Sequence, residues 1–257
     1  MLIIKDVVKS FDGVQVLKGI SAKFEPGKVN MIIGESGSGK TVLLKSIIGL
    51  HPIDSGRIEY DGRNLPDMSS KEVRMLRREV GMLFQGAALF DSLSVLENVR
   101  FPLEMFSDST PAEMEERARF CLCRVNLEEK AFDLMPSEIS GGMQKRVAIA
   151  RAIALQPKYL FCDEPNSGLD PKTALIIDQL ISEITKEFNI TTIINSHDMN
   201  SIMEIGDNII FIEHGEKAWE GNKYNIFHSH CKSLNNFVFA SDLFKEVKKA
   251  HNAHNIL

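Results

Sequence analysis

The chain has 257 residues, of which 44% are hydrophobic and 25% charged, as is typical of a globular protein with a filled core. This length suits one large α/β domain with an inserted subdomain, or two small domains. The net charge of −5 gives no basic field that would favour nucleic acid, so no nucleic-acid partner is expected. The apolar runs are short, Lys5, Asp6 and Lys9 interrupt the start, and the four cysteines lack metal or disulfide spacing, so we expect a cytosolic protein.

Short strands are predicted in the first quarter of the chain, where apolar residues alternate or run together. They cover residues 2–4, 14–17, 20–24, 29–33 and 56–62. Asp12-Gly13 is typical of a hairpin turn between the first two strands. The strand at 29–33 runs directly into a glycine-rich loop, and the apolar spacing after that loop predicts a helix over Thr41–Leu50.

From about residue 69 the chain becomes more charged and its patterns mostly helical. We expect a helical subdomain inserted into the core at about 86–155. Strand patterns return further on, at residues 159–162, 191–195 and 209–212. A helix predicted over Thr173–Phe188 separates the first two of these strands, and such alternation is typical of a parallel sheet in an α/β fold.

The glycine-rich loop matches the P-loop pattern in full, with a strand before it and a helix after it. Its residues are Gly34, Glu35, Ser36, Gly37, Ser38, Gly39, Lys40 and Thr41. Glycines let successive backbone N–H groups converge on a phosphate, Lys40 reaches the β- and γ-phosphates of ATP, and the Thr41 hydroxyl binds Mg²⁺. The alternative, a glycine-rich turn with a chance lysine, does not account for the flanking strand and helix.

A second chemical signal is the pair of acids that ends the apolar strand at 159–162. Asp163 is placed to hold the shell of Mg²⁺, and Glu164 is placed to polarise an attacking water as a general base. Acids after a strand are also common as plain caps. The pair gains weight only because a P-loop lies upstream.

Between these two motifs, Ile139–Gln144 (Ile-Ser-Gly-Gly-Met-Gln) resembles the signature sequence of ABC ATPases, and further family motifs follow in order over residues 1–220. The resemblance implies a P-loop NTPase core with an N-terminal antiparallel β subdomain and an inserted helical subdomain. It also implies an ATPase that binds ATP and Mg²⁺, with an ATPase domain over residues 1–221.

The resemblance also implies roles for single residues. Besides the P-loop, it places nucleotide contacts at Phe11, Val42, Ser140, Gly141, Gly142, Met143 and Asp170. It gives catalytic roles to Lys40, Gln85, Glu164 and His197, and Mg²⁺ ligation to Thr41, Gln85 and Asp163. Taken singly, Phe11 could be a core aromatic, Gln85 a surface amide and His197 a structural histidine.

The chain contains one P-loop and one signature, and in the resembled family these two elements meet across a dimer interface with ATP between them. A single copy would hold two half-sites, so we expect a symmetric homodimer. The resemblance further implies a permease that docks on the groove around Gln85–Phe90, on the cytoplasmic side of the inner membrane.

Several details point to a subgroup. Val42 replaces the usual second hydroxyl after the P-loop, and the signature ends in Met143 where most relatives have glutamine. Phe84–Val95 and Met135–Met143 closely resemble the ATPase of Mla-type bacterial lipid transporters, in which a permease and an MCE-domain protein move phospholipid between inner and outer membranes. An importer of amino acids or another small solute is the alternative, and a non-transport regulatory ATPase is the third.

Residues 222–257 form a C-terminal extension with an apolar cluster around Phe237 and Leu243. The pattern predicts a short helix capped by Ser241 or Asp242, which would dock on the ATPase body or steady the second subunit. The alternative is a frayed terminus, with residues 251–257 disordered.

Overall fold

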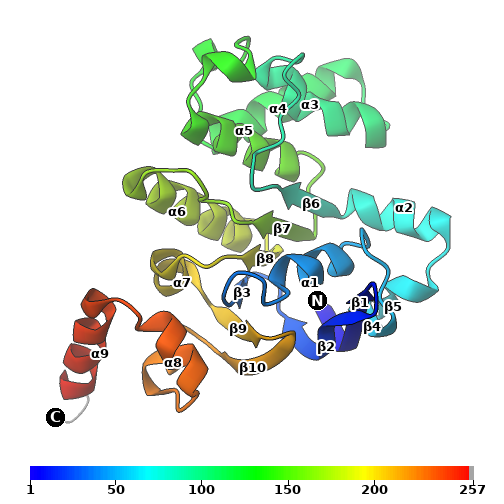
Figure 1. The fold of residues 1–257 in the computed structure, drawn as a ribbon. Helices are drawn as coiled ribbons and strands as arrows, with labels where there is room; N and C mark the ends of the chain where they lie inside the picture. The colour runs from blue at the N-terminus through cyan, green and yellow to red at the C-terminus, as the bar shows by residue number, and fades with distance from the viewer. Residues whose placement is uncertain (255–257) are drawn as a thin grey trace. The chain divides into compact units, whose positions relative to one another are not determined.

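The computed structural model describes residues 1–254, which fall into two compact units, drawn in Figure 1. Unit 1 comprises residues 1–25, 29–67 and those from 195 onward, and unit 2 comprises 26–28 and 68–194. This division differs from the subdomain boundaries expected at 86–155 and at residue 221, which stay predictions. Within the described part of the chain, no helix is both long and apolar enough to span a bilayer.

Unit 1 contains an antiparallel sheet in the order β2-β1-β4-β5. Its strands are β1 (Leu2–Phe11), β2 (Val14–Phe24), β4 (Ser55–Tyr60) and β5 (Arg63–Asn64). The predicted turn at Asp12-Gly13 is confirmed, with φ of 48° and 80° at its two residues. The break expected between residues 17 and 20 is wrong, because Gly19 is accommodated by a shift in register and β2 continues through it.

A second group of strands in unit 1 has the order β10-β9-β3. Strand β3 (Val29–Ile33), predicted with the same bounds, pairs in parallel with β9 (Asn208–Glu213), and β10 (Glu216–Gly221) pairs with β9 in antiparallel fashion. The helices of this region are α1 (Lys40–Ile47), η1 (Leu65–Asp67) and α7 (Met199–Ile205). Strand β10 was not predicted, because its mixed polar sequence lies half exposed at the edge of the sheet and carries little apolar signal.

Unit 2 contains strands in the order β8-β7-β6, which are β6 (Val80–Leu83), β7 (Tyr159–Asp163) and β8 (Thr191–Asn195). Its helices are α2 (Ser70–Arg78), α3 (Val95–Phe106), α4 (Pro111–Arg124), η2 (Glu129–Ala131), η3 (Pro136–Glu138), α5 (Gly141–Ile153) and α6 (Pro171–Glu187). Strand β6 lies inside the region expected to be mostly helical. Its short, glycine-containing run is too brief to show a period, but it pairs in parallel with β7 along its whole length.

The C-terminal extension forms η4 (Asn225–His228), α8 (Lys232–Val238) and α9 (Asp242–His254). Leu234 and Val238 are buried, and the Phe237 ring lies 5.5 Å from the Phe211 ring of β9 between centroids. Ser241 caps α9 as predicted, since its hydroxyl accepts from the backbone N–H of Phe244 at 3.4 Å. The apolar residues of the extension lie on two helices and not on the one that was predicted. The buried ones lie on α8, whereas Leu243 on α9 is exposed.

Leu243 was expected on the docked face of the extension but is 71% exposed. Residues 251–254 are helical rather than disordered, and residues 255–257 lie outside the described part of the chain. The extension therefore packs on unit 1 through α8.

Replacing Leu234 by alanine should lower the free energy of unfolding by about 2–5 kcal/mol, because it removes a fully buried side chain and leaves a cavity. Urea unfolding of the full chain measures the change. The matched control is Leu243→Ala on α9, which should stay within about 0.5 kcal/mol because its side chain is exposed. Equal effects of the two substitutions would contradict the packing of α8.

Candidate functional site

The P-loop connects β3 to α1, and its backbone has the curled form expected of it. Gly37 and Gly39 have φ of 79° and 106°, values that residues with a Cβ rarely adopt. A Cβ at Gly34 would also meet the carbonyl oxygen of Ile212 on β9. Glycine at these positions is therefore a requirement of the backbone path.

The N-terminus of α1 carries partial positive charge that no side chain of the helix offsets. Gly39 occupies the N-cap without a side-chain hydrogen bond, and the first turn has no acid. Backbone N–H groups at such a terminus bind anions, and phosphate in particular. Lys40 is 7% exposed, and its ammonium donates to the carbonyl oxygens of Gly34 and Glu35, at 2.8 Å each. The lysine charge is thus held over the loop.

Thr41, the predicted Mg²⁺ ligand, is held from the end of β8. The side-chain amide of Asn195 donates to the Thr41 hydroxyl oxygen at 3.1 Å. Asn195 is fully buried, and Ser196 next to it donates its backbone N–H to Ile32 of β3 at 3.2 Å. His197 follows and is exposed. Unit 1 therefore brings the P-loop, Asn195 and the segment bearing His197 together.

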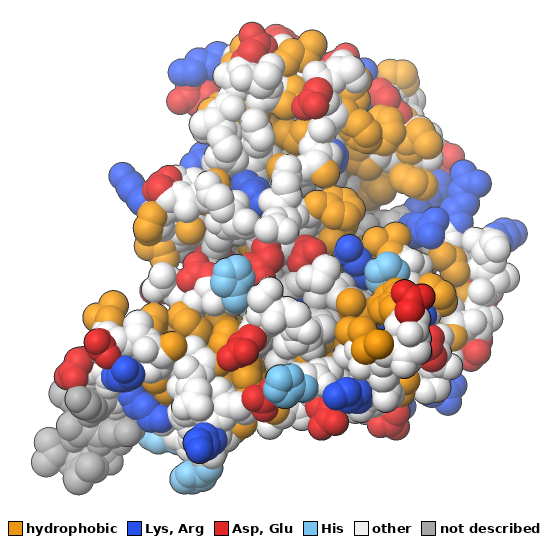
Figure 2. Space-filling model, viewed as in Figure 1, with side chains coloured by type: hydrophobic (Ala, Val, Ile, Leu, Met, Phe, Trp, Pro, Cys, Tyr) orange, Lys and Arg blue, Asp and Glu red, His pale blue; other side chains and the backbone are white. Residues whose placement is uncertain are grey.

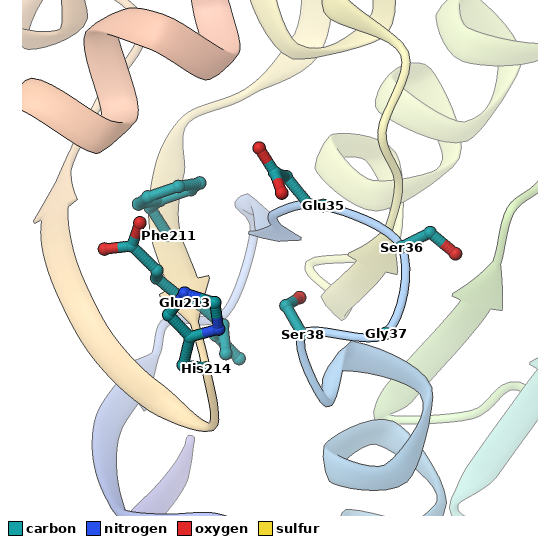
Figure 3. Close-up of a pocket in the computed structure, with 8 residues that line it drawn as sticks. Glu35, Ser36, Gly37, Ser38, Phe211, Glu213 and His214 are labelled. Carbon is teal, nitrogen blue, oxygen red and sulfur yellow. The ribbon is translucent and has the colours of Figure 1, made fainter.

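A small cavity lies between the P-loop and the end of β9 (Figure 3). It measures about 80 Å³ and is lined by Glu35, Ser36, Gly37, Ser38, Phe211, Ile212, Glu213 and His214. In Figure 3, Ser36 points away from this cavity, and the Glu213 carboxylate is directed away from the P-loop. The volume is below the ~300 Å³ of typical ligand pockets, and carboxylates would repel phosphate there. This cavity is therefore not the place for a nucleotide.

Phe11 ends β1 and is 39% exposed. Its ring packs edge-on against the His51 ring with 5.4 Å between centroids, and the Lys9 ammonium lies 5.2 Å from its centroid. The alternative of a core aromatic is thus wrong. A ring that is partly exposed is what stacking on a nucleotide base requires.

In unit 2, β7 ends at Asp163, and Glu164 begins the following turn with a left-handed φ of 48°. The Glu164 carbonyl accepts from the backbone N–H of Ser167 at 3.1 Å. The Ser167 hydroxyl in turn accepts from the side-chain amide of Gln85 at 3.1 Å. The loop after Glu164 therefore holds the side chain of Gln85, which follows β6.

The signature residues form the start of α5. Ser140 is its N-cap, and the Ser140 hydroxyl oxygen accepts from the Met143 N–H at 3.3 Å, which leaves the hydroxyl hydrogen to donate elsewhere. A Cβ at Gly142 would lie 2.7 Å from the Thr173 methyl carbon of α6. Thr173 also bonds Asp170, the N-cap of α6, and its hydroxyl holds the pKa of the Asp170 carboxyl below the usual value. The signature, at the start of α5, and the start of α6 are thus in contact.

The predicted residues fall into two groups, one in each unit. Unit 1 carries Phe11, Gly34–Val42 and His197, and unit 2 carries Gln85, Ser140–Met143, Asp163, Glu164 and Asp170. Sequence reasoning gave no role to Asn195, which orients Thr41, and did not foresee that Ser167 holds the side chain of Gln85. The signal for Asn195 was a polar residue at the end of an apolar strand, directly before Ser196-His197.

A family model described as ABC transporter matches residues 17–167, which include the P-loop, Gln85, the signature and both acids. The chain belongs to the ABC transporter family. As a member of the ABC family it is an ATP-binding ATPase, and the expected α/β fold with an antiparallel β subdomain and a helical part is confirmed.

The sequence relatives of this ABC ATPase include methionine import ATP-binding proteins MetN. That of Clostridioides difficile (strain 630) is 39% identical over 238 residues, which cover 93% of this chain and 74% of the relative. That of Carboxydothermus hydrogenoformans is 40% identical over 255 residues, covering 96% and 75%. These relatives favour the importer over the Mla-type lipid transporter that the motifs at Phe84–Val95 resemble.

Solved structures of other ABC ATPases have the same fold. The dimeric post-hydrolysis state of the ATP-binding cassette MJ0796 bound to ADP and Pi has 33% identity and a TM-score of 0.78, covering 87% of this chain and 99% of that one. The CbiO1 protein of Clostridium perfringens, part of the transporter complex CbiONQ, has 30% identity and a TM-score of 0.83, covering 98% of each chain.

Replacing Gly142 by alanine should lower the free energy of unfolding by about 1–3 kcal/mol, because the new methyl group would overlap the Thr173 methyl and force α5 and α6 apart. Gly141→Ala is the control, since the nearest atom to its Cβ would be a Leu169 methyl at 4.0 Å. Thermal and urea unfolding measure both. Indistinguishable stabilities would argue against the contact between the signature and α6.

Proposed function

We propose that this ABC ATPase hydrolyses MgATP as a symmetric pair and drives the import of an amino acid or another small solute through a membrane permease. The observation that carries the cargo class is the 39–40% identity to methionine import ATP-binding proteins over most of the chain. The site supplies the chemistry, whichever solute is moved.

We assign phosphate binding to the P-loop and to Lys40, on the evidence of the uncapped N-terminus of α1. Thr41 and Asp163 offer oxygen donors, the type that Mg²⁺ prefers, and the amide of Asn195 orients the Thr41 hydroxyl. Bound Mg²⁺ would offset negative charge on the phosphates. Gln85 is assigned as a further ligand of the same ion. It is also assigned as the residue that relays the state of the nucleotide site to the permease.

Glu164 is assigned as the general base that takes a proton from the attacking water. His197 is assigned to the γ-phosphate, and Phe11 to stacking on the adenine ring. The exposure of Phe11 and of His197 supports these two roles, because buried side chains could not reach a ligand.

The symmetric dimer is inferred from the position of the signature residues. Ser140 and the N-terminus of α5 form a second phosphate-binding feature, exposed on unit 2. In a symmetric dimer, this feature of one copy would face the P-loop of the other. The dimeric MJ0796 structure, a cassette bound to ADP and Pi, supports that arrangement.

The permease is proposed to dock on unit 2, from the cytoplasmic side of the membrane, near Gln85–Phe90. Phe84, Phe90 and Met105 expose 42%, 43% and 55% of their surface, and hydrophobic side chains gather over the helical part of unit 2 in Figure 2. Exposed apolar groups of this kind are typical of protein interfaces.

Phospholipid transport with an MCE-domain partner is the second candidate. It rests on the resemblance of Phe84–Val95 and Met135–Met143 to Mla-type ATPases. These residues form the loop after β6 and the start of α5, which serve docking and ATP chemistry and do not touch the cargo.

The Glu164→Gln substitution should abolish steady-state ATP hydrolysis and retain ATP binding, since the amide keeps the shape of the side chain and removes the base. The loss of turnover should reach about 100-fold or more. Phosphate release and nucleotide affinity are the two measurements. Turnover near the wild-type rate would refute the assignment of Glu164.

The cargo is tested on the chain purified with its membrane partner. In proteoliposomes with ATP, we expect uptake of radiolabelled methionine or another amino acid, and none in the matched Glu164→Gln complex. Phospholipid extraction together with an MCE-domain partner would instead support the second candidate. A chain with ATPase activity but no membrane partner would contradict both.

A further inference from the structure

The segment Gln85–Ala88, which follows β6, has a strained backbone that contacts from outside the segment must stabilise. Ala87 and Ala88 are consecutive residues with left-handed φ of 61° and 51°. Residues with a Cβ are strained there and persist only where the surrounding structure holds them. Ala87 is buried, and the two local bonds, Ala87 N–H to the Phe84 carbonyl and Ala88 N–H to the Gly86 carbonyl, close tight turns.

Arg151, in the last turn of α5, makes one set of stabilising contacts. Its two terminal nitrogens donate to the carbonyl oxygens of Ala88 and Ala87, at 2.8 Å each. The planar guanidinium thus spans the two strained residues, and its central carbon also lies 5.8 Å from the Phe90 ring centroid. Burial lowers the pKa of Arg151, but the group stays charged because an arginine is protonated at any physiological pH.

Lys145, six residues earlier on α5, makes the second stabilising contact. It is 5% exposed, and its ammonium donates to the backbone carbonyl of Gln85. A buried ammonium that bonds a carbonyl is expensive to displace, because any movement of either partner leaves a desolvated charge. Burial accordingly lowers the pKa of Lys145.

Both cations lie on the helix that begins at Ser140. The main chain of Gln85–Ala88 is therefore tied to α5 at three carbonyls, those of Gln85, Ala87 and Ala88. The side chain of Gln85 is tied separately, to Ser167 in the loop after Glu164.

We propose that Lys145 and Arg151 are positioning residues that fix the Gln85 loop to the signature helix, so that a displacement of α5 moves Gln85. This inference rests on the proposed function, in which Ser140 meets nucleotide and Gln85 meets Mg²⁺ and the permease. The inference adds a physical link between Ser140 and Gln85, made by Lys145 and Arg151 within unit 2. The strained alanines make the loop depend on that link, since without the two cations the backbone would relax to right-handed or extended forms.

The first test is amide hydrogen exchange in the full chain without nucleotide. Lys145→Met and Arg151→Met keep much of the side-chain volume and remove the donors, so exchange at Gly86–Phe90 should rise about tenfold while β7 and α6 stay unchanged. The matched control is Arg119→Met on α4, which loses an exposed pair with Glu115. Wild-type exchange at Gly86–Phe90 in both cation variants would overturn the proposal.

Substituting glycine for the two strained alanines tests whether Arg151 stabilises their backbone conformation or contributes only ordinary packing. Glycine adopts left-handed φ without strain, so Ala87→Gly with Ala88→Gly in the Arg151→Met background should recover much of the lost protection. No recovery would overturn the strain argument.

The second test is ATP turnover by the same variants. Lys145→Met and Arg151→Met should lower kcat about tenfold and leave the KM for ATP within about twofold, because the P-loop is untouched. Unchanged kcat together with raised exchange would overturn the positioning role. The exchange test needs no nucleotide, so a wild-type chain that failed to hydrolyse ATP would refute the proposed function without affecting that result.

Discussion

A helix whose N-terminus has no cap organises this molecule. Every α-helix starts with backbone N–H groups that lack partners within the helix, and most of the helices in residues 1–254 meet that need with a serine, threonine or aspartate. Helix α1 begins instead after Gly39, in a loop whose glycines hold conformations that other residues rarely adopt. The start of such a helix favours an anion, and Lys40 adds a full positive charge beside it.

The surroundings of α1 are built to keep that loop in place. Strand β3 delivers the chain into the loop, β9 lies against it at Gly34, and β8 ends with the amide that holds Thr41. Each of these strands is almost wholly buried, which fixes the backbone to which the loop is attached. In unit 2, the start of α5 is held against the start of α6 by the contact of Gly142 with Thr173.

Sequence reasoning located most of the fold where the local pattern is strong. Strands β3 and β8 were predicted with the observed bounds, and the α1 and α6 helices within three residues, because buried apolar runs, caps and glycines act locally. Strands β6 and β10 were not predicted, because they form through pairing with β7 and β9 and their own residues show little strand pattern. The ties of Asn195 to Thr41 and of Lys145 to Gln85 join residues 154 and 60 positions apart, which no local pattern reports. The lipid-transport expectation had another weakness, since it rested on two short segments, Phe84–Val95 and Met135–Met143, whereas the methionine import ATP-binding proteins are 39–40% identical over 88–96% of the chain.

The close approach of Gly142 to Thr173 has a consequence for how such a chain can diverge. A side chain at 142 fits without a shift of α5 or α6 only if the residue at 173 gives up its methyl group, and the side-chain bond to Asp170 is kept only if that residue retains a hydroxyl. Serine meets both conditions. The two positions therefore do not drift independently, and an alignment of descendants should record their changes as a pair.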